Sequence, residues 1–155
     1  MHPTIPRLVL AETLDPAAEH PDTTALAALY NRSVDSVKGF AKMVEKAEPS
    51  FRATAARFGA LHDSHVDRLA GLLAAKGMMP DADGSIMGTL NQAVVSFRAL
   101  VDDIDEGVMD QVRSGEDWVL KAFDAAIAEQ PQAAAALHAL RDELSDLLAE
   151  TQDLG

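Results

Sequence analysis

The sequence of 155 residues contains no cysteine, which excludes disulfide bonds, thiolate zinc sites, iron–sulfur clusters and a cysteine nucleophile. Any metal site must therefore use imidazole, carboxylate or water as ligands. Aromatic residues are also few, with five Phe, one Trp and one Tyr, and isoleucine is scarce beside alanine and leucine. This composition favours helices over sheets.

Basic residues are scarce as well. Lys and Arg number 13 against 25 Asp and Glu, so the formal net charge is -12. Such a surface repels phosphate groups and concentrates cations, so we expect no nucleic-acid partner and no binding to anionic membranes. The apolar stretch 8–11 is broken by Glu12, and it is too short for a secretory signal or a membrane span. We therefore expect a soluble, cytoplasmic protein.

Prolines divide the chain into two regions. Four of the seven lie within the first 21 residues, where regular helix is unfavourable. We interpret residues 1–22 as a Pro-rich N-terminal arm, either docked on the body or free, and residues 23–155 as a helical bundle.

Five helices are predicted from apolar residues that recur at alternating spacings of three and four. The first starts near 22–24 and runs to about 47. The second opens at Pro49 and stops at Gly77, the third spans 86–104, the fourth ends before Pro131, and the last covers 137–151.

The connections between these helices indicate their arrangement. About two residues join the first and second helices, so the two must be antiparallel neighbours, and the same holds for the fourth and fifth. The third helix, with about 20 residues, would span about 30 Å, the length of a bundle. This predicts an all-α, ferritin-like four-helix bundle of two antiparallel hairpins with a long crossover helix between them. A plain five-helix up-down bundle is the competing arrangement.

Polar residues within the apolar seams are the candidate functional residues, because burying them unsatisfied costs several kcal/mol. His62 and His65 lie three apart on the second helix, Glu116 occupies a seam position on the fourth, and Glu143 lies near the seam of the last. Together they could hold iron, zinc or manganese. A buried hydrogen-bonded network without metal is the alternative. Ser33 also lies in a seam, and we expect it to bond to its own helix carbonyl or to mark a ligand position.

Several short motifs point to a family. They are Lys38-Gly39-Phe40, the Gly77 stop after Leu72-Leu73, Gly84-Ser85-x-x-Gly88 and Gly115-Glu116-Asp117. With these, the chain from about residue 23 to 154 resembles a proteobacterial four-helix-bundle family of unknown function within the ferritin-like (rubrerythrin-like) superfamily. The resemblance implies a ferritin-like bundle with no assigned activity.

The superfamily pattern places one Glu on the first helix, Glu-x-x-His on the second, one Glu on the third bundle helix and Glu-x-x-His on the last. By this resemblance His65 and Glu116 occupy matching positions, whereas His62 stands where a Glu is expected. Ser33 replaces the first-helix Glu, and Leu140-x-x-Glu143 replaces the last pair. Too few bridging carboxylates remain for two metals, which leaves a single-metal site.

The predicted function is therefore a ferritin-like protein with a degenerate interior site that binds one iron or zinc ion through His62, His65, Glu116 and Glu143. The alternative is a non-enzymatic structural or protein-interaction bundle that has lost metal chemistry. A homo-oligomer, specifically a dimer, is also expected, because the adjacent Leu147 and Leu148 suggest apolar surface beyond one seam.

Overall fold

The computed structural model describes residues 23–80 and 106–153, which form helices and no β-strand. The four long helices are α3 (Thr24–Lys46), α4 (Pro49–Ala74), α6 (Met109–Glu129) and α7 (Ala134–Glu150). Two single-turn 3₁₀ helices, η2 (Glu106–Val108) and η3 (Pro131–Ala133), precede α6 and α7. The prediction of an all-α helical bundle is confirmed. The predicted arm, 1–22, and the predicted crossover helix, 86–104, lie outside the described residues.

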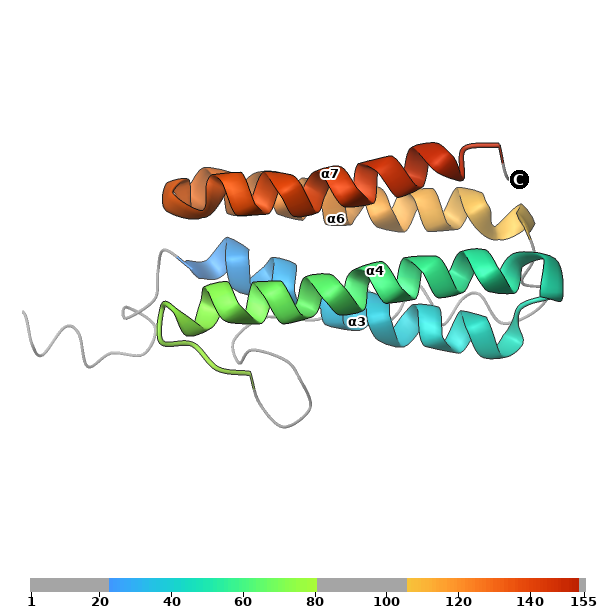
Figure 1. Ribbon diagram of the computed structural model, residues 1–155, viewed down its shortest axis with the longest axis horizontal. Coiled ribbons are helices and arrows are strands. Elements are labelled where there is room, and N and C mark those ends of the chain that lie inside the picture. The colour runs from blue at the N-terminus through green and yellow to red at the C-terminus, as the bar shows by residue number, and fades with distance from the viewer. Residues whose placement is uncertain (1–22, 81–105, 154–155) are drawn as a thin grey trace, which may run out of the picture.

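The helices form two antiparallel hairpins, α3 with α4 and α6 with α7 (Figure 1). Helix α4 ends at one end of the bundle and α6 begins at the other, so these two helices run in the same direction. Helix α3 packs against α4 and α6, and α7 packs against the same two helices. Helices α4 and α6 therefore face each other across the bundle interior, and every pair of neighbours is antiparallel. Within the described ranges, no helix combines the length and the apolar character needed to cross a membrane.

Backbone chemistry explains the ends of α4. Pro49 is the first residue of the helix, where its missing N–H breaks no helical hydrogen bond. At the other end Gly77 has a φ of +81°, and the Met78 N–H donates to the Leu73 carbonyl at 3.0 Å. This left-handed closure favours glycine, as expected from the sequence.

The start of α3 is capped by a distant side chain. The sequence suggests a local cap at 22–24, but Thr23 makes no side-chain cap bond. Instead, the Ala25 and Leu26 N–H groups donate to the two carboxylate oxygens of Glu129, at the end of α6, at 2.9 and 3.1 Å. A negative charge also suits the positive end of the helix dipole. Glu129 therefore ties the two hairpins together.

Replacing Glu129 by alanine is expected to lower the free energy of unfolding by about 1 kcal/mol, the usual cost of losing an N-cap. Urea unfolding followed by circular dichroism would measure this change. Glu45→Ala is the matched control, because Glu45 is an exposed glutamate on α3 and its loss should change stability by less than about 0.5 kcal/mol. Equal effects of the two substitutions would contradict the capping role.

The residues at the predicted alternating spacings are buried throughout α6 and α7: Val112, Glu116, Val119, Phe123 and Ala126 on α6, and Leu137, Leu140, Leu144 and Leu147 on α7. On α4 the same pattern is buried apart from Leu72, which is half-buried. On α3, Val37 and Val44 are also half-buried, whereas polar residues outside the predicted seam are covered. These are Asn31, Asp35 and Ser36. Burial raises the pKa of Asp35. The inward face of α3 is thus wider than its apolar spacing indicates.

The apolar pair near the C-terminus belongs to the chain's own core. Leu147 is buried, and Leu148 packs against the core cluster. Among the described residues, the large apolar side chains that are exposed are instead Met79 and Trp118. The predicted dimer therefore stays a prediction to which these leucines add no support.

Candidate functional site

Each of the four long helices places a polar side chain in the interior of the bundle or at its edge. Ser33 on α3 and both His62 and His65 on α4 are 0% exposed, and Glu116 on α6 is 2% exposed. Glu143 on α7 lies at the edge of the bundle: its side chain is 44% exposed, but its carboxylate contacts the buried His65. The inward orientation of the two imidazoles and of Glu116, expected from their seam positions, is confirmed.

His62 and Glu116 form one buried pair across the bundle. Nε2 of His62 lies 2.7 Å from Oε2 of Glu116, which joins α4 to the opposite helix α6. Phe40 of α3 stacks on the imidazole of His62, with ring centroids 5.7 Å apart and an angle of 13° between the ring planes. Phe58 in turn stacks on Phe40, at an interplanar angle of 12°. The aromatic stack shields this hydrogen bond from water, which strengthens it.

His65 forms a second pair with a different carboxylate. Its Nε2–H donates to Oε1 of Glu143 at 3.0 Å, and Phe123 packs edge-on against the ring at a centroid distance of 5.8 Å. Burial lowers the pKa of His65 to about 4 despite the opposing effect of Glu143. The hydrogen bonds from Arg68 lower the pKa of Glu143. At neutral pH the pair is thus an uncharged imidazole donating to an ionised carboxylate.

Four buried polar atoms in this region have no hydrogen-bond partner within the described structure. They are Nδ1 of His62, Nδ1 of His65, Oε1 of Glu116 and Oγ of Ser33. Of the two alternatives expected for Ser33, a bond to a carbonyl of its own helix is therefore wrong, and the ligand position stays a prediction. A neutral imidazole that donates through Nε2 presents a lone pair at Nδ1, and leaving such groups unpaired costs about 1–3 kcal/mol each. The interior therefore holds several buried polar atoms that a ligand could satisfy.

The four predicted site residues come together as two pairs. Among the described residues, no three His, Asp or Glu side chains are placed so that they could hold one metal ion as they stand. Sequence reasoning also missed Arg68, which binds Glu143 through two hydrogen bonds, at 3.1 and 2.9 Å. Its only signal is its position three residues after His65, on the same side of α4.

Acidification should destabilise the metal-free protein through His65. Its pKa is about 4 in the folded chain and about 6.5 when unfolded, so the unfolded state binds more protons between these values. The contribution of neutral His65 to the free energy of unfolding is therefore present above about pH 6.5 and is lost as the pH falls toward 4. The loss between pH 7 and pH 5 is about 2 kcal/mol. The lowered pKa of Glu143 adds a loss of the same sign at lower pH.

Urea unfolding at pH 7 and pH 5, in the presence of a chelator, would measure this dependence. His65→Leu is the comparison, because it removes His65 and keeps the other titrating groups. One of these is Asp35, whose raised pKa makes the protein more stable as the pH falls, opposite to the effect of His65. The difference in stability between the two pH values should be about 2 kcal/mol smaller in His65→Leu. An unchanged difference would show that His65 does not titrate in this way.

The class of protein that these features define is an all-α four-helix bundle with inward polar residues on every helix. The family described as "Domain of unknown function (DUF2383)" matches residues 22–129, and the chain belongs to this family. The match includes His62, His65 and Glu116, whereas Glu143 on α7 lies beyond it. No curated protein and no solved structure matches the chain.

Proposed function

We propose that this protein is a ferritin-like bundle that binds a single divalent metal ion, iron or zinc, in its interior at His62, His65, Glu116 and Glu143. The arrangement of the helices supports the ferritin-like assignment. The second helix of the first hairpin, α4, and the first helix of the second hairpin, α6, run in the same direction. A bundle of two hairpins with one long crossover connection requires this direction. Each of the four helices also directs a polar residue inward, as carboxylate-bridged metal bundles do.

The observation that carries the proposal is a set of buried polar atoms in the core that have no hydrogen-bond partner among residues 23–80 and 106–153. These atoms are Nδ1 of both histidines and Oε1 of Glu116, and within the described part of the chain each is buried without a hydrogen bond. Imidazole nitrogen and carboxylate oxygen are the ligands that iron and zinc bind. Histidine ligands of metals commonly donate their other ring N–H to a carboxylate. His65 already donates its Nε2–H to Glu143, so in this arrangement Glu143 orients the ring, and it would bind the ion itself only after releasing this hydrogen bond. The chemistry of the donor set therefore fits a divalent ion.

Binding would require a local rearrangement, because no three suitable side chains of the described residues converge as they stand. Glu116 would exchange its hydrogen bond with His62 for a bond to the ion, or rotate its free Oε1 toward it. Phe40 and Phe123, which pack on the two imidazoles, would keep water away from the ion. A bound ion would supply a Lewis acid, or a redox centre if it is iron.

The experiment is a metal analysis of protein purified without chelator and without affinity nickel, followed by anaerobic titration with ferrous iron and, separately, with zinc. We expect a single ion per chain in the wild type and loss of stoichiometric binding in His62→Ala and in His65→Ala. His138→Ala is the matched control, because His138 lies exposed on α7 and should leave binding unchanged. Circular dichroism of each variant would verify that the helices are intact.

The second candidate is a structural or protein-interaction bundle without metal. It is favoured by one specific observation, that each imidazole already has a carboxylate partner, which is sufficient for a structural polar network. Wild-type protein that takes up neither ion at stoichiometric concentration would overturn the metal proposal and leave this second candidate.

A further inference from the structure

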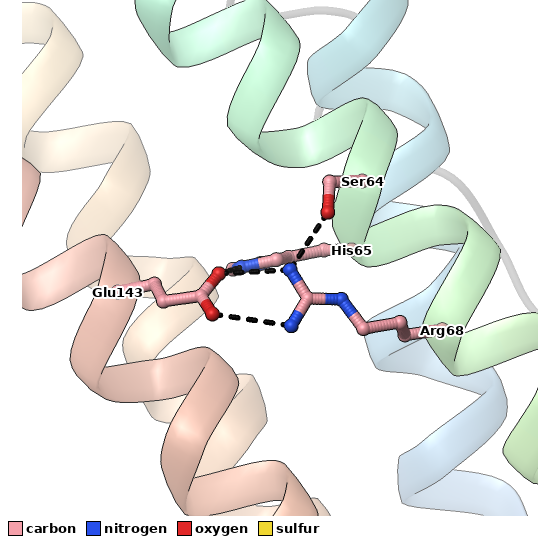
Figure 2. A network of polar contacts seen from close by, with 4 residues as sticks. All are labelled: Ser64, His65, Arg68 and Glu143. Carbon is pink, nitrogen blue, oxygen red and sulfur yellow. Dashed lines mark hydrogen bonds and ion pairs between the residues drawn. The ribbon is translucent and has the colours of Figure 1, made fainter.

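The His65–Glu143 pair lies where the buried interior meets the surface. His65 is 0% exposed, whereas the side chain of Glu143 is 44% exposed and that of Arg68 is 47% exposed. Figure 2 shows Glu143 reaching from α7 toward α4, where both His65 and Arg68 are anchored. Oε1 of Glu143 accepts from both of them, from His65 Nε2–H at 3.0 Å and from Arg68 Nη2 at 2.9 Å. One carboxylate oxygen thus links a buried ring to a surface cation.

Arg68 is held in this position by three hydrogen bonds. Nη1 donates to the second carboxylate oxygen of Glu143 at 3.1 Å, and Nη2 also donates to Oγ of Ser64 at 2.7 Å (Figure 2). The planar guanidinium matches the two oxygens of a carboxylate, so this arrangement fixes Glu143 as well as Arg68. Ser64 precedes His65 directly, so the clamp lies next to His65 along α4.

The clamp also acts on charge. With a formal net charge of -12, the protein attracts cations toward its surface. A divalent ion that approached His65 from this side would meet Glu143, but the carboxylate is already neutralised by Arg68, whose positive charge repels the ion. Helices α4 and α7 also pack less extensively against each other than α3 and α4 do. The contact between α4 and α7 is therefore the weaker of the two, and Arg68 and Glu143 join these helices across it.

We propose that Arg68 is a gate for the interior site: its guanidinium, clamped on Glu143 and Ser64, blocks access of divalent cations to His65 until it swings away and releases the carboxylate. This inference rests on the proposed metal-binding function for the identity of the ion. Independently of the ion, Arg68 would block any small reagent that approaches His65 from the surface. Arg68 is in this sense a positioning residue, because it acts through Glu143.

The test uses Arg68→Gln, which removes the charge and the clamp from an exposed position. Arg141→Gln is the matched control, since Arg141 makes a comparable ion pair between α7 and α6, at 2.8 Å from Asp124, away from the buried histidines. The first measurement is the rate at which diethyl pyrocarbonate acylates His65 in the metal-free, full-length protein, mapped by peptide mass spectrometry. We expect this rate to rise about fivefold in Arg68→Gln, the upper range for loss of an exposed ion pair, and to stay unchanged in Arg141→Gln.

His62 is the internal control for this measurement. Acylation that rises equally at His62 and His65 would reflect general unfolding and would overturn the gate, as would an unchanged rate at His65. The second measurement is the rate of zinc uptake, which should rise in Arg68→Gln while the final stoichiometry stays that of the wild type. Zinc uptake at the same rate in both proteins would overturn control of cation access.

The two proposals can fail separately. If neither protein binds zinc or iron, the metal function and the control of cation access are both lost, yet a selective rise in His65 acylation would still establish that Arg68 restricts access of small reagents to His65. If both proteins bind zinc with equal rates and show equal acylation, the metal function stands and the gate does not.

Discussion

Replacing Phe58 by alanine is expected to lower the free energy of unfolding by about 4 kcal/mol, within the usual range for truncating a buried phenylalanine. Phe58 is 0% exposed and stacks on Phe40 with ring centroids 5.2 Å apart. Phe40 in turn stacks on His62, so the cavity would open beside the ring that supports the buried imidazole. A loss of this size is a large fraction of the 5–15 kcal/mol that stabilises an ordinary domain.

Urea unfolding followed by circular dichroism would measure this loss. The only tryptophan, Trp118, is 59% exposed, so its fluorescence would report the transition poorly. Phe58→Leu is the control, because it conserves most of the volume and should cost less than about 1.5 kcal/mol. A loss below about 2 kcal/mol in Phe58→Ala would mean that the core collapses around the site and does not hold His62 rigidly.

Glu116→Ala is expected to lower the free energy of unfolding of the metal-free protein by about 3 kcal/mol. Glu116 is 2% exposed, and its Oε2 is 2.7 Å from Nε2 of His62. Truncation leaves both ring nitrogens of the buried His62 without a partner among the described residues, and it also leaves a cavity. Chemical unfolding in the presence of a chelator would measure the change without any contribution from bound metal.

The double substitution His62→Leu with Glu116→Leu separates structure from function. Replacing a buried polar pair by apolar residues of similar volume is often neutral or stabilising, so we expect stability within about 1 kcal/mol of the wild type, or higher. Such a result would show that the pair is not needed for folding, in agreement with a binding role. A double variant as unstable as Glu116→Ala would indicate instead that the pair holds the bundle together, as the structural alternative requires.

Much of the secondary structure follows from local chemistry. Alternating spacings of three and four predict the inward faces of α4, α6 and α7, because each residue's position around a helix axis depends only on its place in the chain. For this reason the inward positions of His62, His65 and Glu116 could be predicted. The closure at Gly77 was also predictable, since a positive φ at a helix end favours glycine.

Partners from distant segments could not be predicted in this way. Glu129 caps α3 from 104 residues away, and periodicity within one helix contains no information about such a contact. Ser33 lacks the local bond that serine usually makes inside a helix, because the packing around it determines where its hydroxyl points. The polar face of α3 at Asn31 and Asp35 is buried for the same reason.

The amino-acid sequence by itself determined that residues 23–80 and 106–153 form a helical bundle and which polar residues face inward, because helix geometry is repeated every few residues. Only the tertiary structure decided that His62 pairs with Glu116 and His65 with Glu143, and that Arg68 also binds Glu143. These choices depend on the distance and register between helices and on side-chain rotamers, which are set by packing across the whole bundle.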